Sequence, residues 1–122
     1  MIYTICIGSN EHRKENMALA RRRLSELFSD IRFAREEDTL PLACRREAMF
    51  SNQVARFASA RFPEEVSGCL KAIEREAGRS SADKQQEIVR LDIDMLMCDS
   101  VVYKPDDLKR AYIVRGLKEL KG

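Results

Sequence analysis

The sequence predicts one domain, residues 1–122, with a ferredoxin-like α+β fold and a short C-terminal tail. In such a fold a β-α-β-β-α-β order gives a four-stranded, mainly antiparallel sheet with both helices on one face. Two observations lead to this prediction. Four stretches have the composition and alternation of strands, and two others repeat their apolar residues at helical spacing. With 44% apolar and 34% charged residues, the chain has the composition of a globular domain rather than a disordered one.

The first half of the chain predicts a strand, a helix and a second strand. "IYTICI" (Ile2–Ile7) is apolar on both faces, which is typical of a central strand, and "GSN" at residues 8–10 is typical of a turn and helix cap. Residues 13–29 repeat apolar side chains at helical spacing, while three consecutive arginines fall largely on the outer side. Ile31–Thr39 then resumes strand character.

The second half predicts a strand, a helix and a strand. A long connection that contains Pro41 leads to Ala48–Ser59, whose alternation predicts the third strand. Pro63 stands where a helix should begin, and Gly78 stands at a good position for its end. A polar loop precedes the fourth strand at residues 88–97, and the tail that follows is weakly patterned.

Composition excludes several classes of protein. A net charge of +2 with interspersed signs gives no continuous basic surface, so we expect no nucleic-acid partner. The first residues are strand-like rather than a signal peptide, and no apolar run approaches the roughly 20 residues of a membrane span. We therefore expect a cytoplasmic protein without membrane contact. Its four cysteines lack the spacing of a zinc site and are expected to be reduced thiols: Cys6, Cys44, Cys69 and Cys98.

The stretch "RLDIDMLM" combines strand alternation with two aspartates. A strand places Arg90, Asp92 and Asp94 on one face, with the carboxylates about 6–7 Å apart at the backbone. Their repulsion is on the order of 2 kcal/mol at an effective dielectric near 20 and must be offset by solvent, arginines or a cation. Oxygen ligands of this kind suit Mg²⁺, although an open, solvated face explains the pair as well. The opposite face is expected to pack against the helices through Leu91, Ile93, Met95 and Met97.

Other polar residues accompany the aspartates. Glu74 and Arg79 bracket the end of the second predicted helix, and Arg115 lies in the tail. Arginines near metal-binding carboxylates are well suited to a polyphosphate, because each is planar, charged and bidentate. Asn52 shares an otherwise apolar strand face with Phe50. This asparagine either faces solvent at a strand edge or recognises a planar heterocycle beside an aromatic ring.

The order and spacing of five segments resemble the 6-hydroxymethyl-7,8-dihydropterin pyrophosphokinase family of the folate pathway. The resemblance runs from Ile2 to about Met97. Its segments are "IGSN" (Ile7–Asn10), "TLPL" (Thr39–Leu42), "FSN" (Phe50–Asn52), "IEREAGR" (Ile73–Arg79) and "RLDIDML" (Arg90–Leu96). The resemblance implies the ferredoxin-like fold and the Mg²⁺-dependent transfer of pyrophosphate from ATP to the pterin hydroxymethyl group, with release of AMP.

The resemblance also implies a role for each site residue. Asp92 and Asp94 would hold two Mg²⁺ ions, and Arg79 would act with them in catalysis. The pterin would contact Thr39, Pro41, Leu42, Phe50 and Asn52, and the nucleotide would contact Glu74, Arg79, Arg90 and Arg115. A helix-end carboxylate facing Arg79 would explain Glu74 equally well. The implied partners are ATP and a pterin, and the expected state is a monomer or weak homodimer.

The sequence departs from the family pattern on the nucleotide side. Gln86 stands where the family usually has Trp, Ser81 and Val89 stand where it has arginines, and Lys109 and Arg110 replace a His-Tyr pair. These departures favour a second hypothesis, a non-catalytic protein that binds a pterin or a metal on the same fold. A third hypothesis, an RNA-recognition module of the same element order, lacks the aromatic strand motif of that class and has an acidic strand instead.

Overall fold

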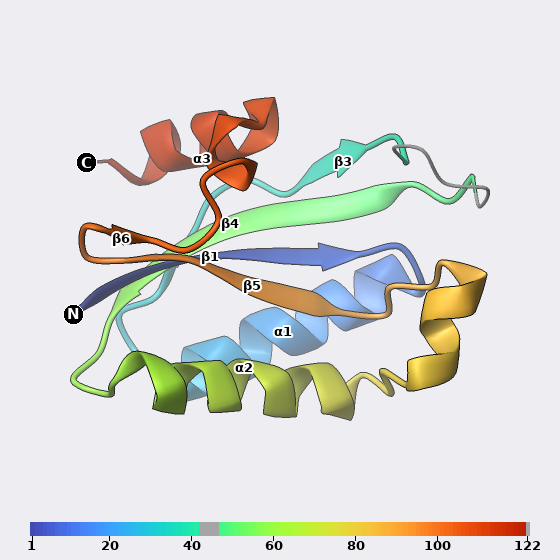
Figure 1. Ribbon diagram of the computed structural model, residues 1–122, viewed down its shortest axis with the longest axis horizontal. Helices are drawn as coiled ribbons and strands as arrows, with labels where there is room; N and C mark the ends of the chain where they lie inside the picture. Colours follow the sequence, from blue (N-terminus) through green and yellow to red (C-terminus); the bar gives the residue numbers. More distant parts are fainter. Residues whose placement is uncertain (42–46, 122) are drawn as a thin grey trace.

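The computed structural model describes residues 1–41 and 47–121 and shows one antiparallel sheet with helices on both faces (Figure 1). The strands are β1 (Ile2–Ser9), β2 (Arg32–Phe33), β3 (Glu37–Thr39), β4 (Phe50–Ala58), β5 (Asp92–Cys98) and β6 (Val101–Val102). The helices are α1 (Arg13–Leu27), α2 (Pro63–Glu76) and α3 (Ala111–Leu120), with short 3₁₀ segments η1 (Ser81–Gln86) and η2 (Asp107–Lys109). The sheet order is β2-β4-β1-β5-β6, and β3 also pairs with β4.

The described residues form an α+β fold as predicted, but the sheet has six strands rather than four. The predicted strand Ile31–Thr39 divides into β2 and β3, because Phe33 pairs with Ala55 whereas Glu37 pairs with Asn52. Three residues of this segment therefore lie opposite two of β4, which is the pattern of a bulge. The sixth strand, β6, forms a short hairpin with β5 in the segment where a weakly patterned tail was expected.

The main core lies between the sheet and the paired helices α1 and α2, which cover the same face (Figure 1). Helical and strand periodicities predict this core correctly, because each element contributes its apolar side to it. Its fully buried members include Tyr3, Ile5 and Ile7 of β1, Met17 and Leu24 of α1, and Val66, Leu70 and Ile73 of α2.

Helix α3 covers part of the opposite face, which the sequence prediction left open (Figure 1). Ile113 and Leu120 are buried there against Val54 of β4 and Leu96 of β5. Gly116 allows the close approach, since a Cβ at this position would lie 2.7 Å from Cγ2 of Val54. The tail is therefore an amphipathic helix that completes a second, smaller core.

A bulge in β5 changes which of its residues face each core. Ile5 pairs with Met95 and Thr4 pairs with Met97, so Leu96 is an extra residue without a partner in the β1 ladder. Leu96 lies on the α3 face, like Asp92 and Asp94, and the alternation reverses after it. The prediction that Met97 packs against the paired helices is wrong for this reason, because Met97 contacts the α3 core.

Strand β1 also extends further than predicted. It continues through Gly8 and Ser9, which were expected to form a turn, and both residues pair with β4. None of the described helices is long and apolar enough to cross a membrane.

Replacing Gly116 by alanine should destabilise the protein by about 1–3 kcal/mol, because the new methyl group would overlap with Val54 and push α3 away from the sheet. The matched control is Gly68→Ala in α2, where a Cβ meets no atom within 4 Å. Helix propensity alone should make that variant more stable by about 0.5–1 kcal/mol. Urea unfolding of both variants measures the difference, and a stabilised Gly116→Ala protein would contradict this packing.

Candidate active site

A row of three residues crosses the centre of the sheet on the α3 face. Asn52 of β4 pairs with Gly8 of β1, and Gly8 pairs in turn with Asp92 of β5. Directly paired residues of antiparallel strands project to the same face, so Asn52 and Asp92 flank the glycine at a backbone separation of roughly 10 Å. Any large side chain at position 8 would fill the space between them. Gly8 thus has a role in the site that the sequence prediction of a turn missed, although "IGSN" was among its recognised segments.

Asp92 and Asp94 lie on this face as the strand pattern predicted, and both are partly exposed. Burial, followed by the nearby Asp92 carboxylate, raises the pKa of Asp94 to about 7, and Lys104 only partly offsets this shift. The repulsion inferred from the sequence is therefore present in the folded protein. Among the described residues no group of three or more acidic, histidine or cysteine side chains could enclose a metal ion. The pair can supply only part of a coordination shell.

Cys6 pairs with Asp94 across the β1–β5 ladder, on the same face. Burial and the neighbouring carboxylates raise the pKa of its thiol to about 12, so it stays protonated and is a poor nucleophile. Cys69 and Cys98 are also free thiols, and Cys44 lies outside the described residues. A cysteine-based reaction is therefore not supported at this site.

Arg79 and Glu74 hold the first residues of β5. The Arg79 Nη1 atom contacts Oε1 of Glu74 at 3.0 Å and Oδ1 of Asp92 at 3.1 Å. The other Glu74 oxygen accepts a hydrogen bond of 2.8 Å from the backbone N–H of Ile93, on the side of β5 away from β1. Burial raises the pKa of Glu74, whereas the Ile93 N–H and Arg79 oppose that shift. The structural interpretation of Glu74 is therefore supported, and its contact with a nucleotide stays a prediction.

The other two arginines predicted for the nucleotide each have a carboxylate partner. Arg90 precedes β5 and donates a hydrogen bond of 3.1 Å from Nε to the buried Asp83 of η1. Arg115 of α3 binds Glu37 of β3, at 2.7 Å from Nη2 and 3.1 Å from Nε. Since β3 lies on the far side of β4 and β1 from β5, the structure does not bring Arg115 together with Asp92.

Most of the residues predicted for the pterin do come together. Asn52 is 7% exposed, which excludes a solvent-facing position, and its Nδ2 donates to Thr39 Oγ1 at 2.9 Å. A longer bond of 3.3 Å joins the same nitrogen to the Glu37 carbonyl. Phe50 pairs with Thr39 and therefore projects to the same face of the sheet as Thr39 and Asn52. The partly buried Pro41 ends the described segment, and Leu42 lies outside the described residues.

A groove of about 1310 Å³ runs beside β5, between α2, η1 and the chain that follows β6. Its acidic lining residues are Glu64, Glu74, Asp83, Asp92 and Asp94, of which Glu74 and Asp83 are buried. Its basic lining residues are Lys71, Arg75, Arg79, Lys84 and Lys104. Apart from Arg79, these basic residues were missed from the sequence, because they come from separate elements and each resembles an ordinary surface residue.

The loop before β5 is fixed by the "SN" of "IGSN". Asn10 is buried, and its Oδ1 accepts a bond of 2.6 Å from the Val89 N–H while its Nδ2 donates to the Glu87 carbonyl at 2.9 Å. Ser9 Oγ donates to the Arg90 carbonyl at 2.6 Å. These contacts fix the point at which the chain enters β5. They therefore fix the position of Asp92, the first residue of that strand.

We expect Asp94→Asn to stabilise the metal-free protein at pH 8. Because folding raises the pKa of Asp94 to about 7, the folded state keeps a proton that the unfolded state loses near pH 4. The contribution of Asp94 to stability thus falls as the pH rises from 4 to 7, and asparagine removes this loss. The gain should be on the order of 2 kcal/mol at pH 8, after allowance for solvent screening, and should vanish below pH 4. Urea unfolding in EDTA tests this, and an equal gain at pH 4 and pH 8 would contradict it.

Comparison with known protein families gives a match over residues 4–122, to the family described as 7,8-dihydro-6-hydroxymethylpterin-pyrophosphokinase (HPPK). A comparison with curated proteins finds no match. The family match covers nearly the whole chain and extends past Met97, where the resemblance of individual segments ended, through β6 and α3. The chain belongs to the 7,8-dihydro-6-hydroxymethylpterin-pyrophosphokinase family.

Proposed function

We propose that this protein transfers the β,γ-pyrophosphoryl group of ATP to the hydroxymethyl group of 6-hydroxymethyl-7,8-dihydropterin. Membership of the family supports a pterin pyrophosphokinase in folate biosynthesis. The observation that carries the finer proposal is the position of Asp92 and Asp94. They lie between Asn52, which is on the far side of Gly8, and a groove whose lining includes Arg79, Lys84 and Lys104. The pterin, which accepts the pyrophosphoryl group, and ATP, which donates it, would thus meet at the two carboxylates.

The carboxylate pair fits Mg²⁺ chemically. Two oxygen donors that repel each other gain from a cation, and their small number leaves room for the phosphates and waters that Mg²⁺ retains. Mg²⁺ bound there would neutralise phosphate charge and lower the pKa of a coordinated hydroxyl. Asp92 and Asp94 would be its ligands, and Arg79, which already contacts Asp92, would be close enough to bind a phosphate oxygen.

The heterocycle subsite is supported by the fixed orientation of Asn52. Its amide nitrogen is bound to Thr39, and its Oδ1 lies on the side of Gly8, 3.9 Å from the place of a Cβ there. A fixed acceptor beside a glycine is suited to the N–H groups of a pterin edge, and Phe50 adds an aromatic side chain on the same face. In this arrangement the substrate hydroxyl would point toward the aspartates.

The chemical step depends on the alignment of the two substrates rather than on a covalent intermediate with the protein. The pterin hydroxyl oxygen forms a bond to the β-phosphorus, the bond from that phosphorus to the oxygen of the α-phosphate breaks, and AMP leaves. The hydroxyl proton passes to solvent. Cationic side chains along the groove, with Arg79 nearest to Asp92, would hold the triphosphate and stabilise the charge that develops on the leaving oxygen.

The second candidate function is pterin binding without turnover. It is favoured by the partners of Arg90 and Arg115, which are bound to Asp83 and Glu37 respectively. Gln86 is also exposed at the end of η1, where the family usually has an aromatic residue. ATP binding would then depend on Arg75, Arg79 and the groove lysines.

Incubation with ATP, Mg²⁺ and 6-hydroxymethyl-7,8-dihydropterin should release AMP in an amount equal to the pyrophosphorylated product. Asp92→Ala and Asp94→Ala should each lower kcat by at least about 10³-fold, because each removes a ligand for the phosphate-bound cation. The control is Asp106→Asn, an exposed carboxylate outside the site, which should retain full activity.

Chromatographic separation of AMP from ADP identifies the reaction. Formation of ADP, or equal activity in the Asp94→Ala protein, would contradict the proposal. No AMP together with tight binding of the pterin would establish the second candidate instead.

A further inference from the structure

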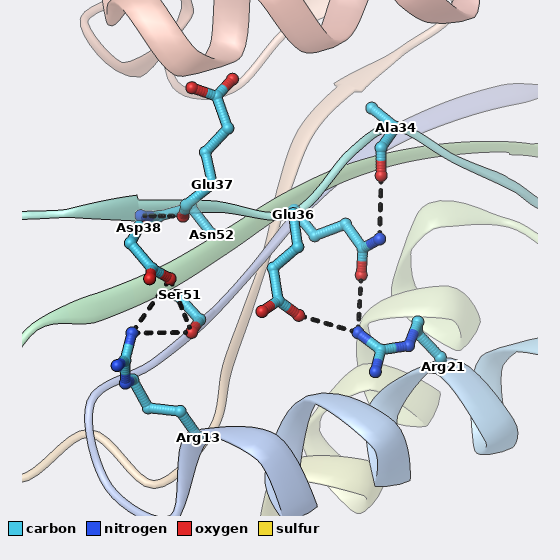
Figure 2. Close-up of polar contacts among 9 residues, drawn as sticks. Arg13, Arg21, Ala34, Glu36, Glu37, Asp38, Ser51 and Asn52 are labelled. Atoms are coloured by element: carbon cyan, nitrogen blue, oxygen red, sulfur yellow. Dashed lines mark hydrogen bonds and ion pairs between the residues drawn. The ribbon is translucent and has the colours of Figure 1, made fainter.

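Three consecutive acidic residues at the start of β3 are each paired with an arginine, and Figure 2 shows the pairs of Glu36 and Asp38. Glu36 lies 2.9 Å from Arg21, Glu37 lies 2.7 Å from Arg115, and Asp38 lies 3.0 Å from Arg13. Arg13 and Arg21 belong to α1, whereas Arg115 belongs to α3.

The pairs lie on both faces of the sheet. Alternation along β3 directs Glu37 toward α3 and Asp38 toward α1, as Figure 2 shows. Two helices on opposite faces therefore hold the same short strand. Arg13 lies on the α1 face, so it cannot contact a heterocycle bound beside Asn52 on the α3 face.

Buried polar groups of β4 fix the two α1 arginines. Arg13 Nη1 donates to Ser51 Oγ at 3.1 Å, and Ser51 is only 2% exposed. Arg21 Nη1 donates to Gln53 Oε1 at 3.1 Å, and the amide nitrogen of Gln53 donates to the Ala34 carbonyl at 2.8 Å. A partly exposed ion pair contributes little alone. Here each arginine is first oriented by β4 and then holds a carboxylate next to it.

Strand β3 needs such support. It has only three residues, pairs with β4 alone in the described part of the chain, and is separated from β2 by the bulge. Yet it supplies both groups that fix the Asn52 amide, namely Thr39 Oγ1 and the Glu37 carbonyl. A shift of β3 would release Asn52 without disturbing the aspartates of β5.

We propose that Arg13 is a positioning residue for the heterocycle subsite. Its pair with Asp38 holds β3 in register with β4, and this register directs Asn52 Oδ1 toward the substrate. The role as a positioning residue for pterin rests on the proposed function. The role of Arg13 in keeping β3 in place does not depend on the proposed function.

Steady-state kinetics of Arg13→Gln provide the test, with Arg23→Gln as the matched control. Arg23 lies on the same helix and also has two carboxylate partners, Glu26 and Glu76, but no contact with β3. Arg13→Gln should raise the KM for the pterin about tenfold and leave kcat and the KM for ATP within about twofold. Arg13→Lys should recover part of the loss, and added salt should raise the wild-type KM but change that of Arg13→Gln little.

An unchanged pterin KM in Arg13→Gln, or an equal rise in Arg23→Gln, would overturn the proposal. If Arg13→Gln does not fold, Ser51→Ala leaves the Arg13–Asp38 pair in place but removes the bonds of Ser51 Oγ to both of its members, and it should give a smaller rise in the same constant. If the wild type makes no AMP, the proposed function fails independently. Hydrogen exchange at the β3 amides then tests whether Arg13 holds β3. Exchange should be faster in Arg13→Gln than in Arg23→Gln, and equal exchange in the two variants would reject this role of Arg13.

Discussion

The two carboxylates of β5 impose the constraint on which the rest of the site depends. Asp92 and Asp94 project from the same face, and the Asp92 carboxylate adds to the burial that destabilises the charged form of Asp94. Arg79 pairs with Asp92, whereas Asp94 keeps a pKa near 7 because burial and its neighbour outweigh Lys104. A protein that needed only stability would have little reason to keep this pair. Such a pair is suited to a cation that is bound together with phosphates.

The surrounding contacts fix the position of that strand before any ligand arrives. Glu74 binds the Ile93 N–H, while Asn10 and Ser9 bind the loop that leads into β5. On the other side of Gly8, Thr39 holds Asn52 in one orientation. Both halves of the site are therefore preorganised, which reduces the entropy that binding must offset.

Sequence patterns predicted the features that depend on local backbone geometry. The features that the patterns missed are determined by pairing between residues far apart in the chain. The faces of Asp92 and Asp94 and the helices α1 and α2 follow from periods of two and 3.6 residues. The bulge at Leu96 reversed the alternation because the register with β1 changes there. Helix α3 has apolar residues at helical spacing, but only ten residues carry the signal. The partner of Arg115 could not be inferred, because spacing along the chain does not indicate which carboxylate a flexible arginine reaches.

The central claim is that Asp92 and Asp94 bind divalent cations jointly with the phosphates of ATP. Electron paramagnetic resonance of Mn²⁺, titrated in the presence of a non-hydrolysable ATP analogue, tests it without requiring turnover. The account predicts two bound ions per chain in the wild type and loss of both in the Asp92→Asn, Asp94→Asn double variant. The same number of bound ions in that double variant would contradict it.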